Sequence, residues 1–441
     1  MDAGNNDQPL DHELVARDPS RYGLTLRDGE YWIEGVPLRT VAQEVGTPTY
    51  VYGRAHVEER YRGLVESLGG RRHTVCYAVK ANSNQAVLRT LAKLGAGADI
   101  VSVGEMKRAL AAGVAADKIV FSGVGKRSDE IDAALESGIR SLNAESAEEV
   151  EQIAARAAAL GKTAPVSLRV NPDVDPDTHP YLATGLREAK FGISMGQTVE
   201  VAGEVLADPN LDLVGITCHI GSQIMDARPF LDSVERLRTL LPALRDAGAN
   251  LRYLDVGGGL GIAYGAADPV VNVESWGSAL ADATADLDVE LMLEPGRYLV
   301  GNAGVLLTRV LARKTGEDRD FVIVDAAMND LLRPALYEAY HALTPVRPAP
   351  ANAEVRTADV VGPICECGDF LAQGRAVPWP ETGELVAVCS AGAYGMTMAS
   401  TYNTRPIAAE VLVDGDRYAV VRPRKTVEDL LAEDRVPDWL G

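Results

Sequence analysis

Residues suited to chemistry lie directly after several short apolar runs of the sequence. Lys80 ends the first of these, residues 74–79. A lysine there is unusual, because burying an ammonium group without a partner is unfavourable. An amine in this position can condense with an aldehyde to form an imine, which removes the charge. Alternatively, Lys80 extends its ammonium group to solvent from a strand end. Which role Lys80 has depends on the residues that follow the other apolar runs.

Two further groups offer a flat ring and a phosphate site. His219 is followed by small residues, Gly221 and Ser222, so its imidazole could lie on a planar molecule; a purely structural histidine is the alternative. Gly257, Gly258 and Gly259 follow a later apolar run. Consecutive glycines let backbone N–H groups close around a phosphate, although a tight turn would use the same residues.

The sequence Glu294-Pro295-Gly296-Arg297 follows the last of these apolar runs. A glutamate can keep a pyridine nitrogen protonated, which makes the ring a better electron sink; a surface ion pair between Glu294 and Arg297 is the alternative. An amine, an imidazole, a phosphate loop and a glutamate each match one part of a single ligand. We therefore predict pyridoxal 5'-phosphate as the cofactor.

Polar residues also gather in the last third of the chain. Arg333 and Tyr337 lie four residues apart, Cys365 is followed by Glu366, and Tyr394 lies in a glycine-rich stretch. Arg333 and Tyr337 could simply mark the end of an amphipathic helix. Cys365 could be a buried, inert thiol, which is a common role of free cysteine.

Eight short apolar segments alternate with helical patterns and predict the strands that position these groups. They are residues 74–80, 99–103, 119–122, 141–143, 166–170, 215–219, 253–256 and 290–293. Helical periodicity marks residues 105–112, 146–160 and 229–247. This alternation predicts a (β/α)8 barrel of the TIM type, in which functional residues lie on the loops after the strands. A doubly wound open sheet is the alternative.

After about residue 300, helical patterns become scarce and a mostly antiparallel β domain is predicted. Its strands are expected at residues 305–310, 321–325, 354–361, 384–389 and 410–421. An Asp-Gly turn within residues 24–33 predicts a hairpin, which we expect to pair into this domain. The predicted domains are therefore a cofactor-binding barrel, residues 48–303, and a β domain, residues 1–47 and 304–441.

Composition limits the partners and the compartment. The net charge of −20 argues against nucleic acid and anionic membrane surfaces as partners. No apolar run is long enough to span a bilayer, and the polar, acidic N-terminus is unlike a signal peptide. The five scattered cysteines fit a reducing compartment, so we expect a cytoplasmic protein. Cys365 and Cys367 form a lone CxC, so we expect no metal site.

Ordered motifs extend from about residue 20 to residue 430. They are YAVKAN (77–82), GLREAKFGI (185–193), HIGSQ (219–223), EPGR (294–297), RPALY (333–337), CE (365–366) and GAY (392–394). Together they resemble the bacterial diaminopimelate decarboxylases, which are fold-type III pyridoxal-phosphate enzymes. Family members usually have serine or threonine where this chain has Cys367, which leaves a change in specificity open.

The resemblance implies a cofactor site in the barrel. Lys80 would carry the cofactor as an imine, His219 would stack on its ring and Glu294 would meet the pyridine nitrogen. The resemblance also implies a phosphate site, formed by Gly257, Gly258, Gly259, Gly296 and Arg297 with Tyr394 nearby, and it gives Ser222 as a further cofactor-binding residue.

The resemblance further implies a head-to-tail homodimer with two active sites at the interface. Arg297, Arg333, Tyr337 and Tyr394 would bind the substrate. Cys365 of the partner subunit would donate a proton, and Glu366 of the partner subunit would meet the distal ammonium. Lys80, His219 and Cys365 would then be the catalytic residues.

The implied reaction is decarboxylation of meso-2,6-diaminopimelate to L-lysine and CO2, the last step of lysine biosynthesis. Arg297 or Arg333 would clamp the distal carboxylate of the substrate, because arginine binds carboxylates bidentately. A decarboxylase of ornithine, arginine or carboxynorspermidine is one alternative, and a non-catalytic pyridoxal-phosphate-binding paralogue is another. Alanine racemases share the barrel, but for them we expect arginine in the place of Glu294.

Overall fold

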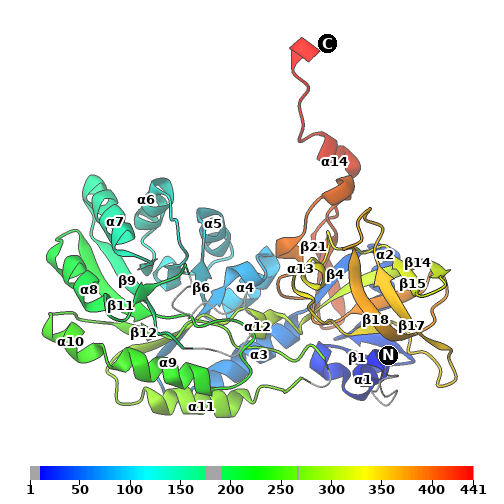
Figure 1. Cartoon of the computed structure of the whole chain (residues 1–441), viewed down its shortest axis with the longest axis horizontal. Helices are drawn as coiled ribbons and strands as arrows, with labels where there is room; N and C mark the ends of the chain where they lie inside the picture. Colours follow the sequence, from blue (N-terminus) through cyan, green and yellow to red (C-terminus); the bar gives the residue numbers. More distant parts are fainter. Residues whose placement is uncertain (1–9, 175–189, 266–267, 441) are drawn as a thin grey trace. The chain divides into compact units, whose positions relative to one another are not determined.

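The computed structural model describes residues 10–174, 190–265 and 268–440 (Figure 1). The chain forms two compact units. The barrel unit comprises Glu58–Ile262 and Val270–Leu299, and the β unit comprises Met1–Val57, Ala263–Pro269 and Val300–Gly441. No helix within the described ranges is both long enough and apolar enough to cross a membrane.

Eight parallel strands close into a ring in the described part of the barrel unit. They are β5 (His73–Ala78), β6 (Gly97–Ile100), β7 (Ile119–Phe121), β8 (Ser141–Ala144), β9 (Ala164–Asn171), β11 (Leu211–Thr217), β12 (Tyr253–Asp255) and β13 (Glu290–Leu293). The ring closes because β8 pairs with β9 and β13 pairs with β5. A short strand, β10 (Ile193–Ser194), is added alongside β9. Closure confirms the predicted (β/α)8 barrel and excludes the open sheet.

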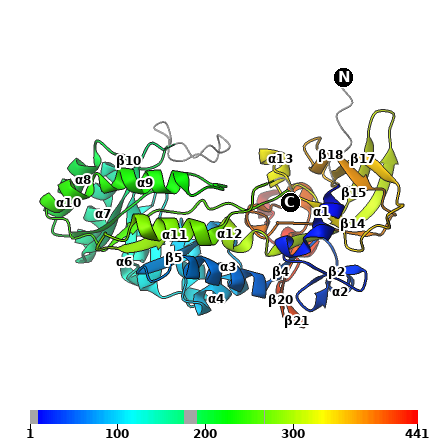
Figure 2. The ribbon, with the colours of Figure 1, turned by 90° about the horizontal axis from the view of Figure 1, so that it is seen from below.

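Helices surround these strands, as the two views of the ribbon show (Figures 1 and 2). They are α4 (Gln85–Lys93), α5 (Val103–Ala111), α6 (Ser128–Ser137), α7 (Ala147–Leu160), α8 (Thr198–Ala207), α9 (Arg228–Arg238), α10 (Leu241–Asp246) and α11 (Val273–Ala283). The chain passes between the units within α3 (Arg54–Ser67), between Ile262 and Ala263, between Pro269 and Val270, and within α12 (Arg297–Val300). Because side chains are buried on both faces of the ring, β6, β7 and β8 are buried along their whole length.

Side-chain caps fix the points where several of these helices begin. Asn84, Ser102 and Ser146 each accept a hydrogen bond from a backbone N–H in the first turn of the following helix. Each cap therefore ends a loop that follows a barrel strand. The single helix predicted for residues 229–247 is wrong, because α9 and α10 are separate. Pro242 lies in the first turn of α10 and has no N–H with which to continue the hydrogen bonds of α9.

A large sheet dominates the β unit, in the order β18-β17-β15-β14-β4-β20-β21. Its strands are β4 (Thr49–Gly53), β14 (Gly304–Thr315), β15 (Asp320–Val324), β17 (Val355–Val361), β18 (Phe370–Pro378), β20 (Ala409–Asp414) and β21 (Arg417–Arg422), with β16 (Leu343–Pro345) and β19 (Leu385–Val388) pairing beside β14. Most pairs are antiparallel, as predicted, whereas β15 with β17 and β4 with β20 are parallel. The sequence patterns missed β16 and β18. Strand β4 lies within residues 48–303, the range predicted for the barrel, but it pairs with β14 and β20 of this sheet.

The N-terminal hairpin belongs to the β unit, but it does not pair into the large sheet as expected. It consists of β1 (Thr25–Arg27) and β2 (Glu30–Ile33), and β3 (Val36–Pro37) pairs with the other edge of β2. Both edges of β2 are therefore occupied. Tyr31 and Ile33 instead pack into the hydrophobic core of the unit together with Val305 and Val411. The helices of this unit are α1 (Asp11–Arg17), α2 (Leu38–Glu44), α13 (Arg333–Tyr337) and α14 (Val427–Leu431).

Candidate active site

A cavity of about 250 Å³ lies in the barrel unit. It is lined by Lys80, Val101, Ser122, Gly123, Arg169, Phe191, Thr217, His219 and Glu294. Most of these residues end a barrel strand or follow it within two residues. The cavity therefore lies at the carboxyl ends of the strands, where barrel enzymes place their active sites.

Lys80 lies in a short helical turn directly after β5 and faces a buried carboxylate. Its Nζ is 3.2 Å from Oδ2 of Asp99, and the Asp99 side chain is fully buried whereas that of Lys80 is 39% exposed. Strand pairing sets this contact, because Asp99 on β6 lies opposite Ala78 on β5. Lys80 therefore does not simply extend to solvent: a carboxylate holds its amine at the cavity.

His219 presents a neutral ring to the cavity. Its Nδ1 accepts a hydrogen bond of 3.1 Å from the backbone N–H of Gly258, so the proton of the neutral imidazole resides on Nε2. Burial, followed by the positive charges of Lys80 and Arg169, lowers the pKa of His219 well below its ordinary value. A neutral, fixed ring of this kind suits stacking on a planar molecule.

Two carboxyl groups are buried close together, that of Glu294, which lines the cavity, and that of Asp255. Burial raises the pKa of Asp255 to about 6, although the N–H of Gly257, which donates to Asp255 Oδ1 at 2.8 Å, opposes the rise. Burial, followed by the charges of Asp255 and Asp99, raises the pKa of Glu294 well above its ordinary value. A cation beside Glu294 would favour the charged carboxylate there.

The three glycines after β12 allow backbone segments to approach very closely. A Cβ on Gly258 would lie 2.0 Å from the carbonyl oxygen of Glu294, and one on Gly257 would lie 2.3 Å from that of Cys218. The N–H groups of Gly257 and Gly258 already donate to Asp255 and His219. Gly257 and Gly258 therefore shape the loop. A phosphate would be bound by other backbone N–H groups of the same loop.

Arg297 and Ser222 form a polar pair in the same unit. Nη2 of Arg297 donates to Oγ of Ser222 at 2.9 Å, and Arg297 is buried although it is charged. A guanidinium group together with a hydroxyl group suits the oxygens of a phosphate.

Comparison with known proteins agrees with this chemistry. Residues 54–301 match the pyridoxal-binding domain of the pyridoxal-dependent decarboxylases. The diaminopimelate decarboxylase of Pseudomonas fluorescens is 53% identical over 410 residues, which cover 93% of this chain and 98% of that protein. The chain belongs to the diaminopimelate decarboxylase family. The family that the sequence motifs resemble is thus confirmed, and with it a pyridoxal-phosphate-dependent decarboxylase.

Solved structures of family members share the fold. Diaminopimelate decarboxylase from Helicobacter pylori, complexed with L-lysine, is 39% identical, with a TM-score of 0.86 over 90% of this chain and 98% of that one. The enzyme from M. jannaschii, also in complex with L-lysine, is 35% identical, with a TM-score of 0.89 over 95% of this chain and 98% of that one.

The residues at the cavity fit pyridoxal phosphate, the cofactor of this family. Lys80 offers an amine and His219 a neutral ring. Glu294 is a buried carboxyl group that a protonated ring nitrogen would satisfy. Beside the cavity, the buried Oδ1 of Asp99 has no hydrogen-bond partner within the described ranges, so a nearby positive charge would stabilise this carboxylate.

Arg333 and Tyr337, which the sequence predicts as substrate-binding residues, belong to α13 of the β unit. Arg333 is buried and donates through Nη1 to Nε2 of His341 at 2.8 Å. The ring of His341 must then carry its proton on Nδ1, which donates to the carbonyl oxygen of Cys389 at 2.9 Å. The guanidinium of Arg333 also lies 4.5 Å from the ring centroid of Tyr264. The side chain of Arg333 is therefore held in place, and Tyr337 is half-buried.

The other predicted residues of the β unit lie on loops. Cys365 and Glu366 are exposed after β17, and the N–H of Cys365 donates to Oδ1 of Asn403 at 3.0 Å. Tyr394 has a positive φ of 55°, a strained conformation that is common at functional sites. The structure thus gathers Lys80, His219 and Glu294 at one cavity, while the roles of the β-unit residues stay proposals.

Sequence patterns missed several residues that line the cavity or pair with a residue that does. Asp99, which pairs with Lys80, lies on the second barrel strand and carried a signal, because a charged residue inside an apolar strand needs a partner. Arg169 on β9 carried the same signal. Ser122 and Thr217 carried none. Of the motif at residues 185–193, the first five residues lie outside the described ranges.

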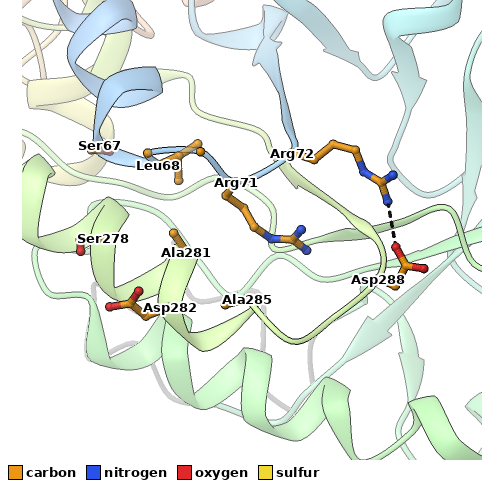
Figure 3. Close-up of a pocket in the computed structure, with 11 residues that line it drawn as sticks. Ser67, Leu68, Arg71, Arg72, Ser278, Ala281, Asp282, Ala285 and Asp288 are labelled. Carbon is orange, nitrogen blue, oxygen red and sulfur yellow. Dashed lines mark ion pairs between the residues drawn. The ribbon is translucent and has the colours of Figure 1, made fainter.

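A second hollow of about 580 Å³ lies at the amino ends of β5 and β13 (Figure 3). Arg72 and Asp288 form an ion pair of 3.8 Å at its edge, and both side chains are largely exposed. None of the predicted site residues lines this hollow. The carboxyl-end cavity is therefore the candidate site.

Replacing Gly258 tests whether the tight loop supports cofactor binding. We expect Gly258→Ala to push the Glu294 backbone away and to weaken pyridoxal-phosphate binding by the cofactor-free protein about tenfold or more. Absorbance titration gives the Kd. Gly196→Ala is the control, because a Cβ there meets nothing within 4 Å. Equal affinities for the two variants would contradict this role of the loop.

The buried carboxyl of Asp255 predicts a dependence of stability on pH. Because its pKa is raised to about 6 in the folded state, the stability due to its proton is complete below about pH 4 and is lost as the pH rises through about 6. Asp255→Asn keeps an acceptor for the N–H of Gly257. The cofactor-free variant should be more stable than the wild type at pH 8, by on the order of 1 kcal/mol, with the difference shrinking towards pH 4.

Urea unfolding across this pH range measures the difference. Asp246→Asn, at an exposed position of α10, is the control and should leave the pH profile unchanged. A stability difference that stays constant from pH 4 to pH 8 would contradict a raised pKa of Asp255 in the folded state.

Proposed function

We propose that this chain decarboxylates meso-2,6-diaminopimelate to L-lysine and CO2, as the last step of lysine biosynthesis. The observation that carries the proposal is the presence of Lys80, His219 and Glu294 around one cavity in a chain of this family. The Helicobacter pylori relative has been solved with L-lysine, the product in this proposal.

Residues of the barrel unit would hold the cofactor and set its charge. Bound pyridoxal phosphate supplies a sink for the electron pair that departing CO2 leaves on the substrate. Lys80 would hold the cofactor through Nζ, which Asp99 keeps at the cavity. His219 would lie against its ring, and Glu294 would stabilise a protonated ring nitrogen. Arg297, Ser222, Gly296 and the glycine loop would bind the phosphate, together with Tyr394.

Residues of the β unit would select the substrate and complete the reaction. Arg333, fixed by His341 and Tyr264, or Arg297 would clamp the distal carboxylate, with Tyr337 and Tyr394 beside it. A substrate without that carboxylate would leave a buried arginine unpaired, which is unfavourable. Glu366 would pair with the distal ammonium, and the Cys365 thiol would donate the proton that replaces CO2.

We further propose a cytoplasmic homodimer in which Cys365 and Glu366 of the partner subunit complete each site. Exposure of Cys365 and Glu366 supports this, since exposed loop residues can reach another chain. Large apolar residues of the C-terminal segment, Leu431, Val436 and Trp439, are 65%, 78% and 81% exposed, and such surfaces usually mark protein interfaces. Five free cysteines fit a reducing compartment. Residues 48–303 remain our proposal for the cofactor-binding domain.

A panel of amino acids tests the substrate. We expect CO2 release from meso-diaminopimelate to exceed release from lysine, ornithine and arginine by a factor of at least about 100 in kcat/KM, the effect of leaving a buried charge without its partner. Arg333→Lys should reduce this preference, because an ammonium cannot bind a carboxylate bidentately. Faster release from ornithine than from diaminopimelate would overturn the proposal.

Mixing inactive variants tests whether the active sites are shared. If each site uses Lys80 of one subunit and Cys365 of the other, a Lys80→Ala/Cys365→Ala heterodimer has one complete site. Subunit exchange between the two inactive homodimers should then restore about a quarter of wild-type activity. The matched control mixes Lys80→Ala with His219→Ala. Both residues line the same cavity of one chain, so every site in this mixture lacks one of them and no activity should return. No recovery in the first mixture would contradict sharing.

A further inference from the structure

A buried carboxylate beside the cavity, that of Glu145, ties together three parts of the cavity wall. Its Oε1 accepts hydrogen bonds from Nη1 of Arg169 at 2.8 Å and from the backbone N–H of Gly123 at 3.0 Å. Its Oε2 accepts one from the backbone N–H of Gly192 at 2.9 Å. Arg169 and Gly123 line the cavity, and so does Phe191, the neighbour of Gly192. A single side chain thus joins the segments that follow β7, β8 and β9.

A second buried ion pair, between Lys126 and Glu149, holds the backbone at Glu145 in place. Oε2 of Glu149, in the first turn of α7, accepts from the backbone N–H of Glu145 at 2.7 Å. Lys126, whose side chain is 1% exposed, lies 3.2 Å from Glu149 and donates to the carbonyl oxygens of Gly123 and Asn143 at 2.8 and 2.7 Å. Each of these buried charges has an opposite partner, which is the condition for tolerating them in the interior.

Arg169 links this network to His219 and Glu294, the residues assigned to the cofactor ring. Its guanidinium lies 4.7 Å from the ring centroid of Phe191, so the cation is fixed on two sides, by Glu145 and by the ring. Its positive charge contributes to lowering the pKa of His219 and opposes the rise in the pKa of Glu294. The position of Arg169 therefore affects both side chains assigned to the cofactor ring.

We propose that Glu145 is a positioning residue of the cofactor cavity, which holds Arg169 and the backbones at Gly123 and Gly192 so that the cavity is formed before the cofactor binds. This proposal rests on pyridoxal phosphate as the cofactor, and it does not depend on which amino acid is decarboxylated. Glu145 itself does not line the cavity, so it acts through the groups that it holds.

Glu145→Gln is the decisive change, because it preserves shape and removes one acceptor. Both oxygens of Glu145 accept hydrogen bonds, whereas glutamine has one oxygen and one NH2 group. One wall segment would face a donor in place of an acceptor, and Arg169 would lose its counter-charge. We expect the Kd of the cofactor-free protein for pyridoxal phosphate to rise about tenfold, as when one buried donor loses its acceptor. Glu145→Asp keeps the charge and should lie between the wild type and Glu145→Gln.

Glu130→Gln is the matched control. Glu130 is similarly buried and accepts from the backbone N–H groups of Val103 and Arg127 at 3.0 and 3.3 Å. Neither Glu130 nor these two donors line the cavity. The control should lower the Tm and leave the Kd unchanged. A merely structural Glu145 would behave in the same way, and equal Kd values for Glu145→Gln, Glu130→Gln and the wild type would overturn the proposal.

Two further measurements keep the outcomes separate. If Glu145→Gln does not fold, the Kd of Glu145→Asp decides, and a wild-type value there rejects the positioning role. Titration of the unmodified cofactor-free chain is done first, because failure to bind pyridoxal phosphate would refute the proposed function and not the network alone. In variants that bind cofactor, the pH profile of kcat should shift for Glu145→Gln and not for Glu130→Gln, since only the former changes the charge around His219 and Glu294.

Discussion

The pairing of Lys80 with Asp99 is the contact on which the rest of the site depends. A lysine at a strand end would ordinarily extend its ammonium group into water. Here a fully buried carboxylate lies 3.2 Å from Nζ, and adjacent parallel strands fix that carboxylate. The position of the amine is thus a consequence of the order in which the barrel strands pair.

A chain of hydrogen-bonded polar side chains runs through the barrel interior towards Glu294. The hydroxyl of Tyr253 donates to Ser141 at 2.6 Å, and Ser141 donates to Oδ1 of Asn143 at 3.2 Å. Nδ2 of Asn143 donates to Ser122 at 2.9 Å, and Ser122 lies 3.5 Å from Oε1 of Glu294. Polar residues thus replace part of the apolar filling common in such barrels. They hold the Ser122 hydroxyl beside the buried carboxyl group of Glu294, at the distance of a long, weak contact.

The sequence was most informative where one local signal determines the structure. Apolar runs of four to eight residues mark buried parallel strands, and all eight barrel strands lie at or within a few residues of the predicted positions. Lys80, His219 and Glu294 could be identified because each is a reactive or charged side chain directly after such a run.

Features set by long-range contacts could not be read in this way. The sequence contains no local signal that joins Glu145 to Arg169 or Arg333 to His341, because their meeting depends on how distant segments pack. The division of residues 229–247 into two helices had a signal in Pro242, but the strong helical periodicity on both sides outweighed it. The separate sheet of the N-terminal hairpin was missed because β3 is only two residues long, too short to show a pattern.

Covalent trapping measures the central claim most directly. Borohydride reduction of the purified holoenzyme fixes the cofactor to whichever amine carries it, and peptide mass spectrometry then locates that amine. The structure predicts a phosphopyridoxyl group on Lys80 and on no other lysine, with the label lost in Lys80→Ala. A label on a different lysine, or none on an enzyme that still releases CO2, would contradict the site described for this chain.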